Sequence, residues 1–210
     1  MHIKICGLTT LEQALAAIEA GADMLGFNFY PPSPRFITPA ACARIMREMR
    51  KQGYVPLTVG VFVNTPPAQI RAILDQCQLD LAQLAGDEPP QDLRDLGDAA
   101  FKAVRPASQD EAMQALADYG RSIPPALLLD ARVPGSYGGS GVLANWEIAH
   151  HLARQAPILL AGGLTPANVG AAIRAVQPWG VDAASGVESS PGVKDRALMT
   201  AFVRAARAAS

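Results

Sequence analysis

Short hydrophobic runs alternate with amphipathic stretches along the chain. Eight of these runs have the length of β-strands, and segments between them carry apolar residues at helical spacing. The predicted strands are His2–Cys6, Asp23–Phe29, Leu57–Val63, Leu79–Leu84, Ala99–Val104, Ala126–Leu129, Ile158–Leu160 and Gly180–Ala183. The pattern therefore predicts β-strands that alternate with α-helices.

The amphipathic segments carry signals for where helices begin. After the first predicted strand, Leu11, Leu15 and Ile18 share one helical face. Thr10 and Gln13 have the spacing of a capping box, in which each side chain satisfies a free N–H at the helix start. Because threonine caps helices and proline is tolerated at their first position, three later helices are predicted to begin at Thr-Pro pairs. The pairs are Thr38-Pro39, Thr65-Pro66 and Thr165-Pro166.

Two of these later helices have clear apolar stripes, which predict their buried faces. The first stripe consists of Cys42, Ile45, Met46 and Met49, and the second of Ile70, Ile73, Leu74 and Cys77.

Strands separated by helices indicate right-handed βαβ units and a parallel sheet. Eight candidate strands match the small end of the (β/α)8 barrel, so we predict a single-domain (β/α)8 TIM barrel over residues 1–210. The alternative is an open doubly wound sheet. That fold needs no eighth strand and usually has a glycine-rich turn after its first strand, whereas this chain has "CGLTT" there.

The composition narrows the possible partners and location. The 210 residues are 50% hydrophobic and 18% charged, with a formal net charge of −1. Such a chain has no basic excess for nucleic acid, no stretch long enough to span a membrane and no signal peptide. We therefore expect a cytoplasmic protein that binds neither nucleic acid nor membrane, as a monomer or a homodimer.

The three cysteines Cys6, Cys42 and Cys77 do not form a disulfide or zinc pattern. Cys42 and Cys77 lie on the apolar stripes and are predicted to be small buried hydrophobes. Cys6 ends the first strand, where a glycine follows at once. Lys4 shares a face with Cys6 by the period of two and is predicted to point inward, where Asp182 is a possible carboxylate partner.

Polar residues follow several of the predicted strands at the end where barrels carry their chemistry. Those singled out are Cys6, Arg35, Gln83, Asp130 and Asp182. Each has a plain alternative: a buried thiol, a solvated charge or a turn-closing carboxylate. Their occurrence together at one rim favours a functional site.

Glycine-rich turns follow the last two predicted strands. Loops at these positions commonly bind phosphate in such barrels, because bare backbone approaches the anion closely. The predicted phosphate-binding residues are Gly162, Gly163, Ser185 and Gly186. A further glycine-rich stretch, "GGSG" at 138–141, is a weaker candidate for phosphate and is predicted to act as a flexible lid.

Seven stretches, taken together, resemble the phosphoribosylanthranilate isomerase family of tryptophan biosynthesis. They extend from residue 4 to 195 in order: "KICGLT", "GADMLGFNFYPPSPRFI", "VGVFVN", "LAQLAGDE", "LLLDARVPGSYGGSG", "ILAGGLTPANV" and "VDAASGVESSPGVKD". The resemblance implies an Amadori rearrangement of N-(5'-phosphoribosyl)anthranilate, a small phosphosugar-anthranilate substrate, with no cofactor and no metal.

The resemblance also implies roles for individual residues. Asp130 would be the general acid that protonates the furanose ring oxygen, and Cys6 the general base that removes the C2' proton. Arg35 would hold the anthranilate carboxylate, and Asp182 would contact or orient the ribose. The turns at Gly162-Gly163 and Ser185-Gly186 would hold the phosphate, and Gln83 is expected to contact the substrate.

The chain departs from the family pattern in places. Ala85 stands where a histidine is common, Ser140 replaces a threonine, and Asn145 replaces an aspartate. We expect these changes to tune activity and not to abolish it.

Three other functions stay open on the sequence. Another phosphosugar barrel, such as a decarboxylase or Schiff-base aldolase, needs a reactive lysine at the rim, for which Lys102 is the other strand candidate besides Lys4. A barrel that binds phosphate without catalysis would not need both Cys6 and Asp130. A second Amadori substrate with an aminoimidazole and two phosphates is also conceivable, but one anion site and a carboxylate-binding arginine favour one phosphate.

Overall fold

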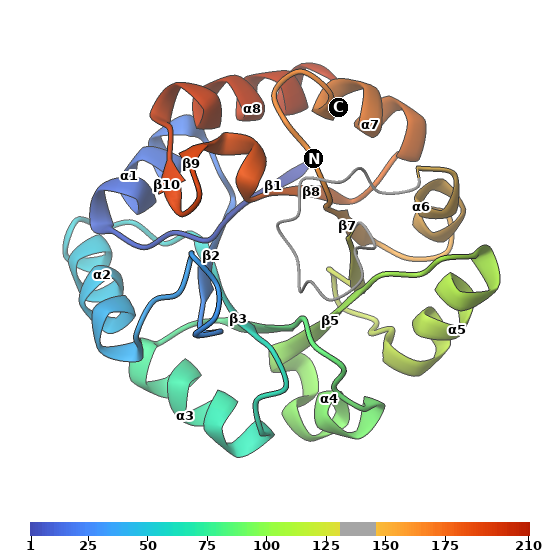
Figure 1. Ribbon diagram of the computed structural model, residues 1–210, viewed down its shortest axis with the longest axis horizontal. Coiled ribbons are helices and arrows are strands. Elements are labelled where there is room, and N and C mark those ends of the chain that lie inside the picture. The colour runs from blue at the N-terminus through green and yellow to red at the C-terminus, as the bar shows by residue number, and fades with distance from the viewer. Residues whose placement is uncertain (131–145) are drawn as a thin grey trace.

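The computed structural model describes residues 1–130 and 146–210, and within them the eight predicted strands form a closed barrel (Figure 1). Each strand pairs in parallel with the next in sequence, and the last pairs with the first. The strands are β1 His2–Cys6, β2 Met24–Asn28, β3 Leu57–Phe62, β4 Leu81–Leu84, β5 Ala100–Val104, β6 Leu127–Leu129, β7 Ile158–Leu160 and β8 Gly180–Ala183. The TIM-barrel prediction is confirmed. The open sheet is excluded because His2 of β1 lies opposite Gly180 of β8.

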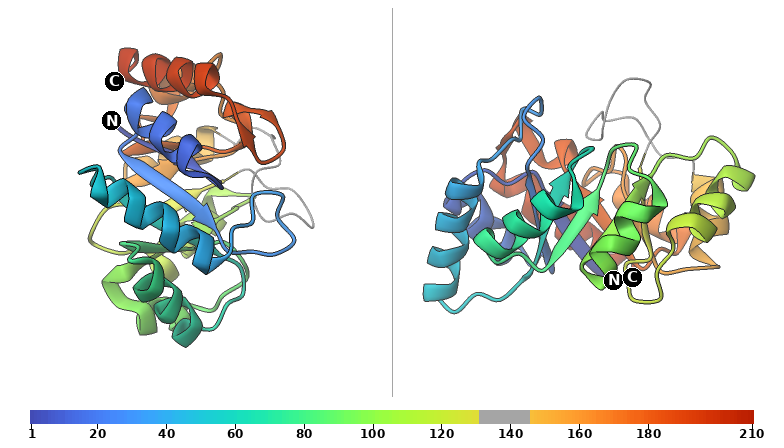
Figure 2. Two further views of the ribbon diagram at one scale, coloured as in Figure 1. Left: turned by 90° about the vertical axis from the view of Figure 1, so that its left-hand side faces the viewer. Right: turned by 90° about the horizontal axis from the view of Figure 1, so that it is seen from below.

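The helices form an outer layer around the barrel (Figure 1). They are α1 Leu11–Ala20, α2 Pro39–Lys51, α3 Pro67–Cys77, α4 Pro90–Leu96, α5 Gln109–Tyr119, α6 Trp146–Ala153, α7 Val169–Val176 and α8 Arg196–Ala208. Short elements lie between them: the 3-10 turns η1 Gly97–Ala99 and η2 Ser185–Val187, and the antiparallel pair β9 Glu188–Ser190 and β10 Val193–Lys194. The two termini lie side by side in all views (Figure 2), and Arg207 of α8 donates to the Met1 carbonyl.

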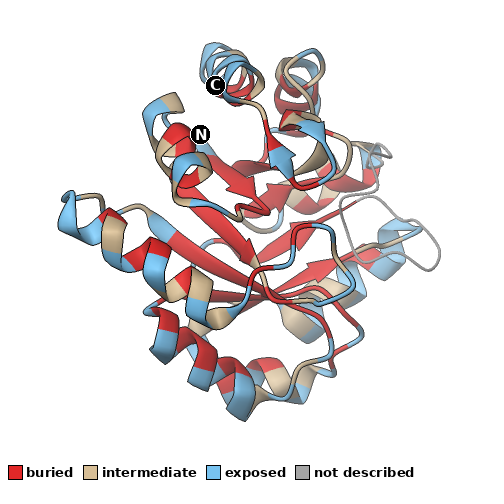
Figure 3. Cartoon of the chain, turned by 60° about the vertical axis from the view of Figure 1, so that its left-hand side comes forward, coloured by how far each residue is buried: buried red, intermediate tan, exposed pale blue. Residues whose placement is uncertain are grey.

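The strand period of two divides the core into two parts. One set of side chains fills the barrel interior, including Met24, Val59, Phe101, Leu128 and Leu159. The other set faces the helices and joins their buried stripes. Figure 3 shows that the strands are mostly buried, whereas the helices carry both buried and exposed residues. Both predicted stripes, on α2 and α3, are confirmed, and Cys42 and Cys77 are buried as expected.

The deepest residues of α1 are alanines and not the predicted stripe. Ala14, Ala16 and Ala17 are buried, whereas Leu11, Leu15 and Ile18 are half-buried and pack at the edge of the core. Small side chains let this helix lie close to the barrel.

The capping box at the start of α1 is displaced by one residue. Thr10 accepts a hydrogen bond from the Gln13 N–H at 3.2 Å, as predicted. The Gln13 side chain, however, accepts from the N–H of Thr9 at 2.9 Å and not from that of Thr10. Thr10 still caps the Gln13 N–H, so the helix begins where the sequence predicted.

Of the three Thr-Pro helix starts, only Thr38-Pro39 is confirmed. Thr38 accepts a hydrogen bond from the Ala41 N–H and caps α2. The prediction for Thr65-Pro66 is wrong by one residue, because Pro66 takes the cap position and Thr65 donates back to the Val63 carbonyl.

The prediction for Thr165-Pro166 is wrong by three residues, because Asn168 takes the cap position of α7. Here Asn168 accepts from the Thr165 N–H at 2.8 Å and donates to the Gly163 carbonyl at 2.9 Å, so a turn precedes α7. That turn holds the loop after β7 in place.

Candidate active site

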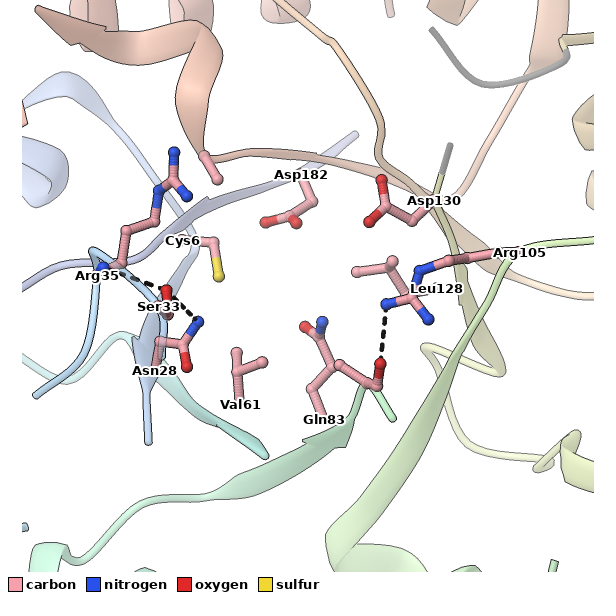
Figure 4. Close-up of a pocket in the computed structure, with 12 residues that line it drawn as sticks. Cys6, Asn28, Ser33, Arg35, Val61, Gln83, Arg105, Leu128, Asp130 and Asp182 are labelled. Atoms are coloured by element: carbon pink, nitrogen blue, oxygen red, sulfur yellow. Dashed lines mark hydrogen bonds between the residues drawn. The ribbon is translucent and has the colours of Figure 1, made fainter. Parts of the chain in front are cut away.

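One pocket lies at the carboxyl ends of the barrel strands and contains every predicted catalytic and substrate-contacting residue (Figure 4). Side chains from β1, β2, β3, β4, β6, β8 and the loops that follow strands converge there. The lining residues are Cys6, Asn28, Ser33, Arg35, Val61, Gln83, Ala85, Arg105, Leu128, Asp130, Asp182 and Ala184.

Cys6 lies next to a buried ion pair. Lys4 and Asp182 are register partners on β1 and β8, and the Lys4 Nζ donates to Asp182 Oδ1 at 3.0 Å. Burial alone would lower the pKa of Lys4, but the charge of Asp182, aided by Cys6, raises it to about 12. Lys4 therefore stays charged directly beside the thiol, and its predicted inward orientation is confirmed.

Burial and charge act in opposite directions on the Cys6 thiol. Burial raises its pKa above the usual value, and the charge of Lys4 together with a hydrogen bond from Lys4 opposes that rise. Space for the sulfur comes from Gly26, the register partner of Cys6 on β2, where a Cβ would lie 2.7 Å from the sulfur.

Arg35 reaches the pocket edge from the loop after β2, but its guanidinium is engaged. The Nε and Nη2 atoms donate to the two carboxylate oxygens of Glu188 at 2.8 and 2.7 Å, a bidentate ion pair. Lys194 donates to the same carboxylate at 2.6 Å. Burial would raise the pKa of Glu188, but the hydrogen bonds from Arg35 and Lys194 outweigh it and lower the pKa, so Glu188 stays ionised.

Asp130 follows β6 and is buried, with its backbone N–H bonded to the Val104 carbonyl. Gln83 on β4 is also buried, and its amide points into the pocket (Figure 4). Arg105 follows β5, and its Nη2 donates to the Ala85 carbonyl at 2.8 Å. These three residues approach the pocket from neighbouring strands.

The predicted phosphate-binding residues come together in an adjoining pocket. Gly162, Gly163, Ser185 and Gly186 line it together with Asp130 and Asp182, which also line the first pocket. Gly162 and Gly163 have left-handed φ angles of 90° and 63°. A Cβ at Gly186 would clash with the Leu164 carbonyl, so only glycine permits this contact between the loops after β7 and β8.

The alternative reactive lysine, Lys102, lies outside the barrel. Its neighbours Phe101 and Ala103 face the interior, so Lys102 points toward the helices, where it donates to Glu88 at 2.7 Å and to the Gly86 carbonyl at 2.7 Å. β5 therefore supplies no reactive lysine to the pocket, which an aldolase or decarboxylase would need.

The stretch 138–141, Ser140 and Asn145 lie outside the described residues. Within residues 1–130 and 146–210, no three histidine, cysteine or acidic side chains gather as a metal site, and no helix has the length and apolarity to cross a membrane.

Several residues at the site were missed in the sequence. Asn28 and Arg105 lie at or just beyond the ends of strands, so the rule that selected Cys6 and Asp130 also applies to them, whereas Gly26 lies in the middle of β2 and had no such signal. Glu188 and Lys194 had no such signal, because their role depends on the hairpin of β9 and β10, which brings them under Arg35.

Comparisons with known proteins point to one family. The sequence model described as "N-(5'phosphoribosyl)anthranilate (PRA) isomerase" matches residues 3–205. A relative of that name from Roseiflexus sp. (strain RS-1) is 49% identical over 216 residues, which cover 100% of this chain and 99% of the relative.

Comparison with solved structures points to the same family. The phosphoribosyl anthranilate isomerase from Thermotoga maritima is 36% identical, with a TM-score of 0.87 and 99% of each chain covered. A further structure of this enzyme, in complex with reduced 1-(o-carboxyphenylamino)-1-deoxyribulose 5-phosphate, is 35% identical, with a TM-score of 0.84 and 99% of each chain covered. The match extends over nearly the whole chain, and the chain belongs to the N-(5'-phosphoribosyl)anthranilate isomerase family.

Proposed function

We propose that this protein is an isomerase of tryptophan biosynthesis that converts N-(5'-phosphoribosyl)anthranilate to 1-(2-carboxyphenylamino)-1-deoxyribulose 5-phosphate. The observation that carries the proposal is the arrangement of the two pockets. Cys6 and Asp130 line one pocket, and Asp130 also lines the glycine-rich pocket beside it. A ribose with its phosphate in the glycine-rich pocket would therefore present its reacting carbons to both groups. Membership of the family supports the same substrate.

Asp130 is the proposed general acid. It donates a proton to the furanose ring oxygen as the bond between that oxygen and C1' breaks. The lone pair of the anthranilate nitrogen forms the new C1'–N double bond, which gives an open-chain Schiff base. A carboxyl group has an unperturbed pKa of about 3.9 and must hold its proton near neutrality, which a buried position favours.

Cys6 is the proposed general base. As a thiolate it removes the proton from C2', and the electron pair of that C–H bond moves to the Schiff base to form an enolamine. The enolamine then tautomerises: the C2' hydroxyl becomes a ketone and C1' gains a proton. The atoms balance without any external oxidant or reductant. The neighbouring Lys4 supports the role, because its charge and hydrogen bond favour the thiolate.

The remaining site residues are proposed to bind the substrate. Backbone N–H groups around Gly162, Gly163, Ser185 and Gly186 would hold the phosphate. Asp182, fixed by Lys4 at 3.0 Å, would orient the ribose. Gln83 and Arg35 would contact the substrate at the other end of the pocket, Arg35 with the N–H groups that Glu188 does not use.

Conversion of freshly generated phosphoribosylanthranilate, followed by loss of its fluorescence, tests the proposal. Wild-type protein is expected to convert it, and Cys6→Ser and Asp130→Asn to lose about 10²–10⁴-fold in kcat each. Both variants keep the shape of the side chain and are expected to fold and to bind product. Near-wild-type turnover by either variant would refute that residue's assignment, and no turnover by the wild type would refute the function.

A further inference from the structure

Lys194 is a buried cation behind the pockets to which neither the sequence nor the proposed function gives a role. It is the last residue of β10, and its side chain is 0% exposed. Its Nζ donates to two acceptors, the Ala184 carbonyl at 2.9 Å and the Glu188 carboxylate at 2.6 Å. Lys194 lines neither pocket, so it is placed to affect a bound substrate only through other groups.

Ala184 is the partner of Lys194 that reaches both pockets. It directly follows β8 and lines the pocket of Cys6 as well as the glycine-rich pocket. The next two residues, Ser185 and Gly186, line the glycine-rich pocket. The hydrogen bond from Lys194 therefore holds the chain at the point where it enters the proposed phosphate site.

The direction of the Ala184 carbonyl also fixes the direction of the next N–H group. The peptide bond between Ala184 and Ser185 is trans, so the C=O of one residue and the N–H of the other point in opposite directions. Because Lys194 holds the carbonyl from behind the loop, the Ser185 N–H is turned to the other side, where the glycine-rich pocket lies. An N–H in this direction can donate to a phosphate oxygen.

The turn after β8 also touches the other half of the proposed phosphate site. A Cβ at Gly186 would clash with the Leu164 carbonyl, so the loops after β7 and β8 lie in close contact there. A rotation of the peptide after Ala184 would move Gly186 against Leu164. The bond from Lys194 to Ala184 therefore supports the arrangement of both turns.

The second partner of Lys194 introduces a competing explanation. Arg35 and Lys194 both bind the carboxylate of Glu188, so these three residues form a buried cluster of two cations and one anion. A cluster with a net positive charge attracts an anion from a distance, whatever the direction of the Ser185 N–H. Position and charge are thus two separate ways for Lys194 to act, and variants can separate them.

We propose that Lys194 is a positioning residue for the phosphate of the substrate, because its hydrogen bond to the Ala184 carbonyl directs the Ser185 N–H into the phosphate site. This inference rests on the proposed function, since the phosphate in question is that of phosphoribosylanthranilate. It gives a role to the stretch "PGVKD" at residues 191–195, which the proposed function leaves without one.

The test measures how strongly binding depends on the phosphate. The probes are the borohydride-reduced reaction product and the same compound after a phosphatase has removed its phosphate. Titration of their aminobenzoate fluorescence gives a Kd for each. Wild-type protein is expected to bind the phosphorylated compound more tightly. In Lys194→Met the ratio of the two Kd values should fall on the order of 10-fold, the lower end of the range for a hydrogen bond to a charged group, because the N–H is displaced and not removed.

Two further variants separate position from charge. Lys194→Met combined with Glu188→Gln removes one cation and one anion, so the net charge of the cluster stays that of the wild type while the bond to Ala184 is absent. This double variant should lose the same phosphate preference as Lys194→Met. It also leaves no buried carboxylate short of a partner, which covers the case that the single variant does not fold. Glu188→Gln alone is the matched control, because it keeps Lys194 and its bond to Ala184, and it should keep the preference.

Each other outcome overturns the proposal. A wild-type ratio in the double variant would show that Lys194 acts through its charge. Equal losses for the two compounds in Lys194→Met would reduce Lys194 to support of the β9–β10 hairpin, and loss of preference in Glu188→Gln would move the role to Glu188. These results leave the proposed function intact. A wild type that binds both compounds equally would contradict the phosphate site itself, and one that does not convert phosphoribosylanthranilate would refute the proposed function and this inference with it.

Discussion

At the scale of single residues, the Cys6 thiol is governed by a balance between burial and charge. Burial is the larger effect and raises its pKa, so the thiolate becomes abundant only on the alkaline side of the usual thiol range. Lys4 lowers the pKa of Cys6 more than Asp182 raises it. Lys4 therefore favours the thiolate form of Cys6, the proposed base. Asp182 in turn keeps Lys4 charged by raising its pKa.

The first prediction concerns this balance. Lys4→Met alone would leave Asp182 as a buried charge without its partner, so the better variant is Lys4→Met with Asp182→Asn. Because Lys4 has the larger effect of the two, the pKa of Cys6 should rise further in the double variant. The pH dependence of alkylation by iodoacetamide measures it, with Cys6→Ser as the control for the other two thiols. A midpoint that stays or moves to lower pH contradicts the role of Lys4.

The second prediction concerns the space that Gly26 provides. In Gly26→Ala the new Cβ would lie 2.7 Å from the Cys6 sulfur and 3.0 Å from the Cys6 Cα, so the strands or the thiol must shift. Overpacking of this kind costs about 1–3 kcal/mol, and here it also displaces the proposed base. The melting temperature and kcat should both decrease, as thermal denaturation and the turnover assay would show.

Gly170→Ala is the matched control for this substitution. Gly170 lies in α7, and a Cβ at this position would have its nearest neighbour 3.5 Å away, an ordinary contact. Alanine should therefore stabilise the protein by about 0.5–1 kcal/mol, through helix propensity alone. If both variants behave alike, the contact at Cys6 is not what limits position 26.

At the scale of secondary-structure elements, two similar Thr-Pro pairs have different roles. Thr38 caps α2 with its side chain, whereas Thr65 leaves the cap position of α3 to Pro66. Thr38→Ala should cost about 1 kcal/mol of unfolding free energy, typical of a lost N-cap, and Thr65→Ala distinctly less. Urea denaturation of both variants measures the difference. Equal losses would mean that the hydrogen bond to Ala41 does not stabilise α2.

The elements also show what sequence patterns can and cannot predict. All eight strands were predicted within two residues of their ends, because the periodicity of buried side chains is a local signal. The third Thr-Pro pair failed because Asn168, a residue from farther along, bonds to both Thr165 and Gly163. Both bonds span only three and five residues, but a rule that considers the Thr-Pro pair alone overlooks an asparagine nearby that forms a turn of its own.

At the scale of the whole molecule, the site shows what local patterns predict and what they do not. The rule that chemistry gathers at the carboxyl ends of barrel strands brought Cys6, Gln83, Asp130 and Asp182 into one pocket correctly. It did not reveal that Arg35 is bound by Glu188, because those residues are 153 positions apart and meet only when the barrel closes. Sequence motifs predicted which residues reach the rim of the barrel. The partners with which these residues form ion pairs are decided only when the barrel closes.

Closure through charged pairs has a consequence for acid stability. Glu188 accepts hydrogen bonds from Arg35 and Lys194 and thereby joins the loop after β2 to the β9–β10 hairpin. Its pKa is lowered in the folded protein, so the stability that it contributes is fully present above its unfolded pKa, about 4.3, and is lost as pH falls through the folded value.

The last prediction follows from this sign. The free energy of unfolding of the wild type should decrease as pH falls below about 4.3, and part of that decrease should come from Glu188. Glu188→Gln cannot take up this proton. It should be less stable than wild type at pH 7, because two buried cations lose their counter-charge, yet its stability should fall less steeply with acid. Urea denaturation between pH 7 and the acid range measures both slopes, with the exposed Glu48→Gln as the control. Parallel slopes in wild type and Glu188→Gln would mean that this carboxylate has an ordinary pKa and that other acids account for the loss.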